Sequence, residues 1–303
     1  MPNKVATAFQ LSLVRLVHVV IASLGALALS SCSMVRIGYD AAPWYASWQL
    51  DRYWGLDSAQ AAYGQDRIEE ILGWHRRSEL PEYARFLRRL NDTVQARPID
   101  LNEATAWRRT LKGFWASSAQ RIAPELTEII VSLRPEQVER MKNRMASENN
   151  DYRKEFLPND LSERQRRRIK RIEERIEEYL GEVTDRQREL VRQMARAMPQ
   201  NEQSWYEERL ARQQDMVALL ERLRRSGQPL SDAQRQDAMM HVTSYLLSVW
   251  EPHDLQRRQS LERVMRASDE ITVAVLNVAT SMQKANLSRR LLGWADDLDA
   301  LAR

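Results

Sequence analysis

Few side chains in this chain have the spacing that metal or catalytic chemistry requires. It has four histidines, and the nearest pair, His241 and His253, lies twelve residues apart with Pro252 between them. Zinc-binding histidines on one helix stand about one turn apart, and the HExxH, GxSxG and Walker A patterns are absent. Carboxylates are numerous, but nothing singles out a pair for acid–base catalysis. We therefore expect no metal, no cofactor and no assignable catalytic residue, which favours a non-enzymatic protein without excluding an enzyme.

The single cysteine has the surroundings of a lipid attachment site. Lys4 and Arg15 precede an apolar run over residues 16–29, and the sequence Leu-Ser-Ser-Cys ends at Cys32. This is the form of a secretory signal, and the run is shorter than the roughly 20 residues of a membrane span. Its end resembles a bacterial lipobox, in which the thiol takes a diacylglyceryl group and the cleaved chain begins at the acylated cysteine. We expect residues 1–31 to be a signal peptide and Cys32 to be lipidated, with palmitate among its acyl chains.

Two alternative interpretations of this segment stay open. One is a plain signal peptide with an incidental cysteine, and the other is an uncleaved anchor. Several acyl chains hold a protein stably at a membrane, at about 0.8 kcal/mol per buried CH₂. Ser33 follows the cysteine, and by resemblance to the sorting rule of enteric bacteria the lack of Asp there favours the outer membrane, facing the periplasm.

Cleavage leaves 44 basic against 42 acidic residues, a net charge of +2. Nucleic acid is therefore not an expected partner; the membrane and envelope proteins are.

One short segment gathers side chains that suit an anion. Residues 74–77 place an indole, an imidazole and two guanidinium groups in succession, and guanidinium groups bind phosphate and carboxylate in a bidentate manner. The candidate contacts for a sugar phosphate or lipid head group are Asp51, Arg52, Trp74, His75, Arg76 and Arg77. The alternative is a helix end, because cationic side chains stabilise the C-terminal end of a helix dipole and Pro81 can begin the next helix.

These side chains must be positioned by helices, because no convincing strand pattern is present. Hydrophobic residues make up 43% of the chain, enough for a large core. The mean hydropathy of −0.58 excludes a multi-span membrane protein, and only nine glycines disfavour sheets. Helical patterns break near Pro81, Pro98, Pro124, Pro135, Pro158, Pro199, Gly227–Pro229 and Pro252. The sequence predicts an all-α protein, an elongated bundle of eight to ten helices over residues 44–303, after a tether over residues 32–43.

Five expected helix starts share a pattern of an apolar residue, usually a capping residue, two variable positions and a glutamine. They are Leu56–Gln60, Leu133–Gln137, Leu161–Gln165, Val183–Gln187 and Leu230–Gln234. The N-cap oxygen accepts a bond from a free amide, and the glutamine reaches back to the amide of the cap. The expected caps are Asp57, Ser162, Thr184 and Ser231, with Pro135 opening the helix after Arg134. The pattern resembles the LTxxQ motif of the Spy and CpxP periplasmic chaperone group, although capping alone can also produce it.

Two expected helices have unusual faces. Residues 161–183 carry an apolar stripe, with cations in the first half and glutamates in the second, an order that opposes the helix dipole. An antiparallel contact, within the chain or in a homodimer, would offset this; a solvated charged face is the alternative. Residues 261–282 are apolar on nearly all sides and predict a central core helix. Residues 288–298 predict a final amphipathic helix with Trp294 packed.

The N-terminal motifs also carry a family resemblance. Leu50–Tyr53, Leu56-Asp57 with Gln60, and residues 74–77 with Glu79–Pro81 follow directly after the lipobox. Together they resemble the proteobacterial lipoproteins of domain-of-unknown-function family 6279. The resemblance implies an envelope lipoprotein and assigns no activity.

We therefore expect a non-enzymatic protein-binding, chaperone-like or scaffold role at the envelope. The alternative is a binding protein or enzyme that acts on an anionic envelope component through residues 74–77. A concave apolar patch rimmed with arginine would favour the first role. Convergence of the six candidate contacts on one open cleft would favour the second.

Overall fold

The computed structural model describes residues 31–198, 201–223 and 230–303, and these ranges form helices and no strands. The helices are α2 (Ser31–Asp40), α3 (Ala42–Trp54), α4 (Ser58–Ser78), α5 (Leu80–Ala96), α6 (Leu101–Ser132), α7 (Pro135–Phe156), α8 (Leu161–Leu180), α9 (Asp185–Ala197), α10 (Asn201–Leu223), α11 (Asp232–Leu247), α12 (Leu255–Asn277) and α13 (Ser281–Leu301). The all-α prediction is confirmed, and the twelve helices in these ranges slightly exceed the expected number. The signal peptide and the breaks at Pro199 and Gly227–Pro229 lie outside the described residues.

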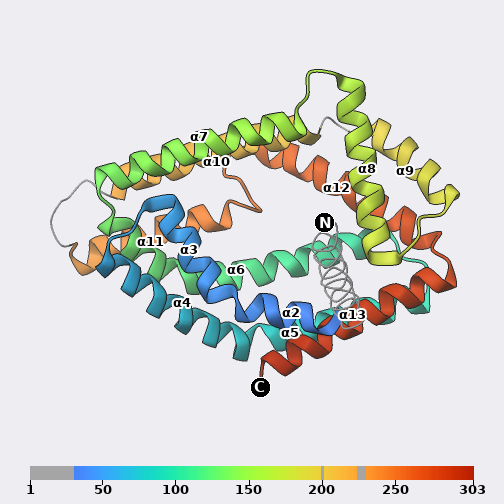
Figure 1. Cartoon of the computed structure of the whole chain (residues 1–303), viewed down its shortest axis with the longest axis horizontal. Coiled ribbons are helices and arrows are strands. Elements are labelled where there is room, and N and C mark those ends of the chain that lie inside the picture. Colours follow the sequence, from blue (N-terminus) through green and yellow to red (C-terminus); the bar gives the residue numbers. More distant parts are fainter. Residues whose placement is uncertain (1–30, 199–200, 224–229) are drawn as a thin grey trace, which may run out of the picture.

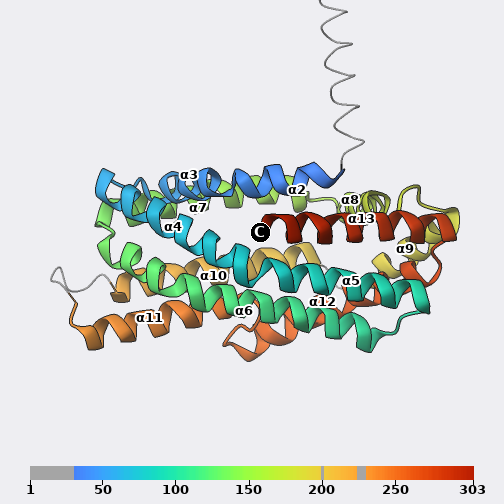
Figure 2. The same cartoon turned by 90° about the horizontal axis from the view of Figure 1, so that it is seen from below.

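The helices form an elongated arrangement with two long sides (Figure 1). α7 and α10 run along one side, and α4, α5 and α13 run along the other. α8 and α9 lie at one end of the molecule, and α3 and α11 lie at the opposite end. Turned by a quarter, the molecule shows α2, α3 and α7 at one face and α6, α11 and α12 toward the other (Figure 2). Instead of a tether, residues 31–40 form α2, which packs along α13.

Buried apolar side chains form two groups near the two ends of the molecule. The first joins α3, α6, α7, α10 and α11, and its most buried members include Ile130, Met141 and Val242. The second joins α5, α8, α9, α12 and α13 around side chains such as Val94 and Val191. Burying each such side chain contributes about 1.5–3 kcal/mol. Two cores of this kind make an elongated molecule stable without one central layer.

Two glutamines of the repeated helix-start pattern meet in the first core region. Gln60 and Gln137 are both buried, and the Gln137 amide donates to Gln60 Oε1 at 2.7 Å. Each glutamine also accepts from the amide of its own N-cap residue, at 3.1 Å for Gln60 and 2.8 Å for Gln137. Each then donates to the backbone ahead of the other helix, Gln60 to Ser132 at 2.8 Å and Gln137 to Gly55 at 3.0 Å. The capping glutamines therefore tie the start of α4 to the start of α7.

The second core region repeats this arrangement with the starts of α9 and α13. The Gln187 amide donates to Gln283 Oε1 at 3.0 Å, and Gln283 donates to Gln187 Oε1 at 2.8 Å and to the Glu182 carbonyl at 2.8 Å. Thr184 and Thr280 are the N-caps, and both helices have complete capping boxes. Residues 279–283 thus form a sixth copy of the helix-start pattern, with Ala279, Thr280 and Gln283 in the apolar, capping and glutamine positions.

Three local predictions are wrong. Pro124 lies inside α6, which continues because Ala119, Ala123 and Thr127 bury one face of the helix there. Gln120, whose carbonyl loses its helical partner to the proline, is exposed to water.

The other two differences concern helix ends. Asp160, and not Ser162, caps α8, because the Asp160 carboxylate accepts from the Ser162 amide at 2.8 Å. The expected core helix over residues 261–282 is divided: α12 ends at Asn277 and Thr280 caps α13. Met282 is 76% exposed as a result. The remaining described breaks, at Pro81, Pro98, Pro135, Pro158 and Pro252, are confirmed.

Candidate functional site

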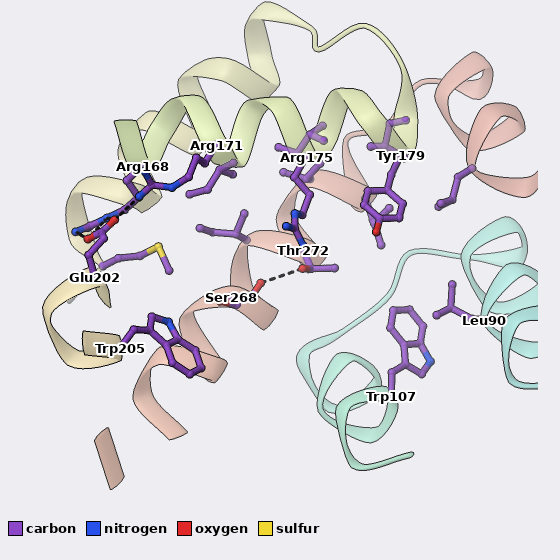
Figure 3. A pocket seen from close by; sticks show the side chains of 18 of the residues that line it. Leu90, Trp107, Arg168, Arg171, Arg175, Tyr179, Glu202, Trp205, Ser268 and Thr272 are labelled. Atoms are coloured by element: carbon purple, nitrogen blue, oxygen red, sulfur yellow. Dashed lines mark hydrogen bonds and ion pairs between the residues drawn. The ribbon is translucent and has the colours of Figure 1, made fainter. Parts of the chain in front are cut away.

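A cavity of about 650 Å³ lies between α8 and α12. Residues of α5, α6, α7, α10 and α13 complete its wall (Figure 3). Its volume lies within the roughly 300–1,000 Å³ of small-molecule sites. Most of the wall is apolar, and the charged side chains gather along α8 and the start of α10. This cavity is the candidate functional site.

One face of α8 supplies most of the site. The residues that line the cavity stand at positions 168, 171, 172, 175, 176, 179 and 180, the three- and four-residue spacing of a single helical face. Ile172, Ile176 and Tyr179 of the predicted apolar stripe lie on this face. Arg168, Arg171 and Arg175 interleave with them. The helix therefore presents an apolar strip beside a row of guanidinium groups.

A buried glutamate at the start of α10 holds two of these arginines. Arg168 Nε donates to Glu202 Oε1 at 2.9 Å, and Arg171 Nη2 donates to the same oxygen at 2.9 Å. Glu202 is only 6% exposed. Burial by itself would raise the pKa of the Glu202 carboxyl, but the hydrogen bonds and charges of Arg168 and Arg171 outweigh it and hold that pKa below its usual value. The carboxylate is therefore ionised near neutral pH.

Arg175 differs from its two neighbours because it has no carboxylate partner among the described residues. Its side chain is directed across the cavity toward Thr272 of α12 (Figure 3). The Thr272 hydroxyl is already used, since it donates to the Ser268 carbonyl of its own helix at 2.9 Å. Ser268 in turn donates to Val264 at 3.2 Å. Because Arg175 is an exposed residue, its guanidinium group borders the cavity in contact with water and without a carboxylate partner among the described residues.

Aromatic side chains border the cavity at both ends. Trp205 lies near Glu202 at one end, and Trp107 lies near Leu90 at the other (Figure 3). Beside Arg171, the rings of Phe156 and Tyr152 stand 4.7 Å apart, and the Arg171 guanidinium lies 5.0 Å from the Phe156 ring centroid. Such contacts favour a cation over an aromatic face. They fix the cationic side chain while leaving the apolar wall continuous.

The charge gradient of α8 is balanced by other helices of the chain. Its basic half pairs with Glu202, while Glu173 lies 3.7 Å from Arg188 of α9 and Glu178 lies 3.9 Å from Arg290 of α13. These contacts support the version of the antiparallel hypothesis in which the partner lies within the chain. The homodimer stays a prediction.

Two of the sequence-predicted anion contacts meet at the junction of α2 and α4. His75 lies between Tyr39 and Tyr83, with Nδ1 3.0 Å from the Tyr39 hydroxyl and Nε2 3.2 Å from the Tyr83 hydroxyl. Burial lowers the pKa of His75, although the nearby Glu79 charge acts in the opposite direction. Arg76 lies over the Tyr39 ring at 5.2 Å and 3.5 Å from Asp40. The three basic side chains of residues 75–77 lie in the last turn of α4, as the helix-end alternative expected.

Of the other sequence-predicted residues, Trp74 touches that junction, and Asp51, Arg52 and Arg77 do not join it. Asp51 is exposed on α3, and the Arg52 guanidinium lies 4.7 Å from the Trp48 ring centroid. Trp74 contacts His75 edge-on, and Arg77 is exposed. None of the six candidate contacts lines the 650 Å³ cavity. Anion binding at these residues, like lipidation of Cys32 in α2, stays a prediction.

Sequence reasoning did not select the cavity residues. The available signal was the spacing of Arg168, Arg171 and Arg175, which follows that of the isoleucine stripe and places cations directly beside it. That spacing could not show that Glu202, more than twenty residues later, partners only two of the three. Within the described ranges, no group of three or more His, Cys, Asp or Glu side chains is placed to hold a metal ion. No helix in those ranges has the length and hydropathy of a membrane span.

The fold and the site define an all-helical bundle protein with an apolar cavity bordered by arginines. The chain belongs to DUF6279, a family of unknown function, whose family model matches residues 52–248. This confirms the predicted family, while the lipoprotein character and the relation to the LTxxQ motif stay predictions. No curated protein and no solved structure matches the chain significantly. The matched range contains the start of α4, all of α8 and Glu202, but not α12 or α13.

Proposed function

We propose that this protein is a lipid-anchored protein of the bacterial cell envelope that binds a ligand in the cavity beside α8 without converting it. The observation that carries the proposal is the cavity itself, about 650 Å³ in volume, apolar in most of its wall and bordered by three arginines. A concave apolar surface rimmed by arginine is the feature expected of a binding or chaperone-like protein. Apolar surface of this kind is retained by a folded protein mainly where something binds.

The chemistry of the cavity favours binding over catalysis. Among the described residues that line it there is neither a histidine nor a cysteine. Its carboxylate, Glu202, has a lowered pKa because of its two arginine partners. A general acid or base works best with a pKa near the working pH, so an ionised glutamate held by Arg168 and Arg171 is poorly suited to that role. It is well suited to fixing two guanidinium groups in place.

The membrane location is supported by the residues that follow the lipobox. Trp44, Tyr45 and Trp48 on α3 are 68%, 53% and 39% exposed, and they stand twelve to sixteen residues after Cys32. Indole and phenol side chains favour the interface between lipid and water. Exposed aromatics close to an expected acyl chain are consistent with a helix that lies against the membrane surface.

The lipid anchor is tested by intact mass and membrane fractionation of the native protein beside Cys32→Ala. We expect a mature chain that begins at an acylated Cys32 in the outer-membrane fraction. The variant should lose both the added mass and the membrane location. A soluble, unmodified chain in the native sample would overturn the anchored part of the proposal.

Binding in the cavity is tested with Nile red, a neutral apolar dye that fluoresces strongly once it leaves water. We expect saturable binding to the mature protein. Thr272→Trp places a large side chain at the cavity wall and should weaken dye binding at least tenfold. Glu270→Trp, on the same helix and outside the cavity lining, is the matched control and should bind as the native protein does. Absence of dye binding to the native protein would remove the basis of the proposal.

A further inference from the structure

We propose that the ligand of the α8 cavity is an anionic amphiphile, a molecule with an acyl chain and a carboxylate or phosphate head group. This inference rests on the proposed function, because it names the ligand class of the same site. It follows from the division of the cavity wall into a long apolar strip and a row of cations. Each part selects a different part of the ligand.

The apolar strip has the length and chemistry that an acyl chain requires. The cavity follows α8 from Arg168 to Tyr179, eleven residues, or about 17 Å at 1.5 Å per residue. Ile172 and Ile176 of α8 and Ile271 and Val275 of α12 all contribute to its wall. The hydroxyls of α12 that line the cavity donate to carbonyls of their own helix. A chain of methylene groups needs no hydrogen-bond partner and loses none on entering.

A polypeptide segment fits the same strip less well. Along the apolar strip its backbone N–H and C=O groups would meet isoleucine, valine and leucine side chains, and the hydroxyls of Ser268 and Thr272 already donate within α12. A buried backbone group without a partner costs free energy comparable to a lost hydrogen bond. The apolar strip therefore favours a lipid chain over an unfolded protein segment.

The row of cations selects the charge of the head group. In the part of the chain that the structure describes, three guanidinium groups line the cavity against a single carboxylate, that of Glu202. Arg168 and Arg171 share this carboxylate, and Arg175 has no carboxylate partner in the described part of the chain. A guanidinium group matches carboxylate and phosphate in a bidentate geometry. We therefore assign Arg175 as the main head-group contact, with Arg171 beside it.

The experiment measures displacement of Nile red from the mature protein by four amphiphiles that share an oleoyl chain. Oleate and oleoyl-lysophosphatidylglycerol carry a carboxylate and a phosphate; oleyl alcohol and oleoyl-lysophosphatidylcholine carry no net charge. We expect the two anionic compounds to bind at least tenfold more tightly than the neutral pair. The comparison between the two anionic compounds shows which head group the site prefers.

Arg175→Gln and Lys170→Gln form a matched pair for the same assay. Both remove one cation from an exposed position of α8, but only Arg175 lines the cavity. Arg175→Gln should weaken the binding of the anionic compounds about tenfold, because one charge-assisted hydrogen bond is lost, and should leave the binding of oleyl alcohol unchanged. Lys170→Gln should change neither. Added salt should weaken oleate binding and not that of oleyl alcohol.

Three results would overturn the inference, and they differ in whether the proposed function survives. Equal affinity for oleate and oleyl alcohol, with no effect of Arg175→Gln, would show that charge plays no part. Displacement of the dye by a permanently unfolded polypeptide, and by none of the amphiphiles, would identify a protein segment as the ligand. In both cases the cavity is still a binding site and the proposed function survives. Failure of Nile red to bind the native protein would remove both.

Discussion

At the scale of single residues, the structure shows that side chains of one type have different roles according to their partners. Arg168 and Arg171 are fixed by Glu202, while Arg175 faces the cavity without a carboxylate. His75, the most conspicuous side chain of the predicted anion site, is enclosed by two tyrosines. A sequence gives the types of these side chains, whereas their partners come from helices that are distant in the chain.

His75 leads to a prediction about stability and pH. Burial lowers its pKa in the folded protein below the unfolded value of 6.5, so the folded state binds the proton less well than the unfolded state. The stabilising contribution of the neutral imidazole is therefore complete above pH 6.5 and is lost as the pH falls through the lowered value. We expect the free energy of unfolding to decrease between pH 7.5 and 5.5.

The measurement is a urea unfolding series over this pH range for the native protein and His75→Gln. The amide of glutamine does not titrate here, so the variant should show a flatter profile. Glu202 does not interfere, because its lowered pKa places its own loss of stability below the usual value of 4.5. Identical profiles for the two proteins would show that His75 titrates alike in the folded and unfolded states.

At the scale of the helices, much of the fold could be predicted from local signals. Prolines and capping residues located most helix ends, and the apolar stripe of residues 161–183 identified the buried face of α8. These local signals failed at positions where tertiary contacts determine whether a helix continues or ends. Pro124 is accommodated by burial of its neighbours, and the start of α13 at Thr280 was hidden inside an apolar run. The pairing of Gln60 with Gln137, and of Gln187 with Gln283, joins helix starts that are 77 and 96 residues apart.

These glutamine pairs predict a difference between equivalent motif positions. Gln137→Ala removes a buried amide and takes away the side-chain partner of the Gly55 carbonyl and of the Arg134 amide, while Gln60 keeps its bonds to Ser132 and Asp57. Each unsatisfied buried group costs about 1–3 kcal/mol, so we expect a loss of about 2–4 kcal/mol in the free energy of unfolding. Gln234 caps α11 in the same way but is exposed. Gln234→Ala should cost no more than about 1 kcal/mol.

Urea unfolding of the two variants measures this difference, and a double-mutant cycle tests its cause. Since Gln60 and Gln137 share their bonds, Gln60→Ala combined with Gln137→Ala should cost less than the sum of the single changes. Additive effects, or equal losses at positions 137 and 234, would show that the glutamines act only as separate caps.

At the scale of the whole molecule, the position of α2 and α3 relates the cavity to the expected membrane anchor. Both helices lie on one face (Figure 2). Arg36 of α2 donates to the buried Asp297 of α13 at 2.8 Å, which fixes α2 to the helix that lines part of the cavity wall. Helix α2, which follows the predicted cleavage site, is thus joined to the bundle, and an acyl chain on Cys32 would hold the bundle close to the bilayer in a restricted orientation.

The exposed aromatic side chains of α3 predict a second contribution to membrane binding and orientation, one that does not depend on the acyl chains. Trp44 and Trp48 stack with their ring centroids 6.2 Å apart, and Tyr45 lies beside Trp48. In the unlipidated variant Cys32→Ser, the triple change Trp44→Ser, Tyr45→Ser and Trp48→Ser should weaken co-sedimentation with phosphatidylethanolamine–phosphatidylglycerol vesicles at least tenfold. Burial of only about 60 Å² of apolar surface already contributes about 1.5 kcal/mol, which corresponds to that factor.

The control removes exposed apolar side chains elsewhere, by changing Met240, Leu255 and Met282 to serine, which are 57%, 63% and 76% exposed. These residues lie on α11, α12 and α13 and should leave vesicle binding unchanged. If the control weakens binding as much as the aromatic variant, the protein adsorbs through apolar surface in general and α3 sets no orientation. If only the aromatic variant loses binding, α3 is the face that meets the lipid, and the cavity is held at a fixed height above the membrane from which an amphiphile would come.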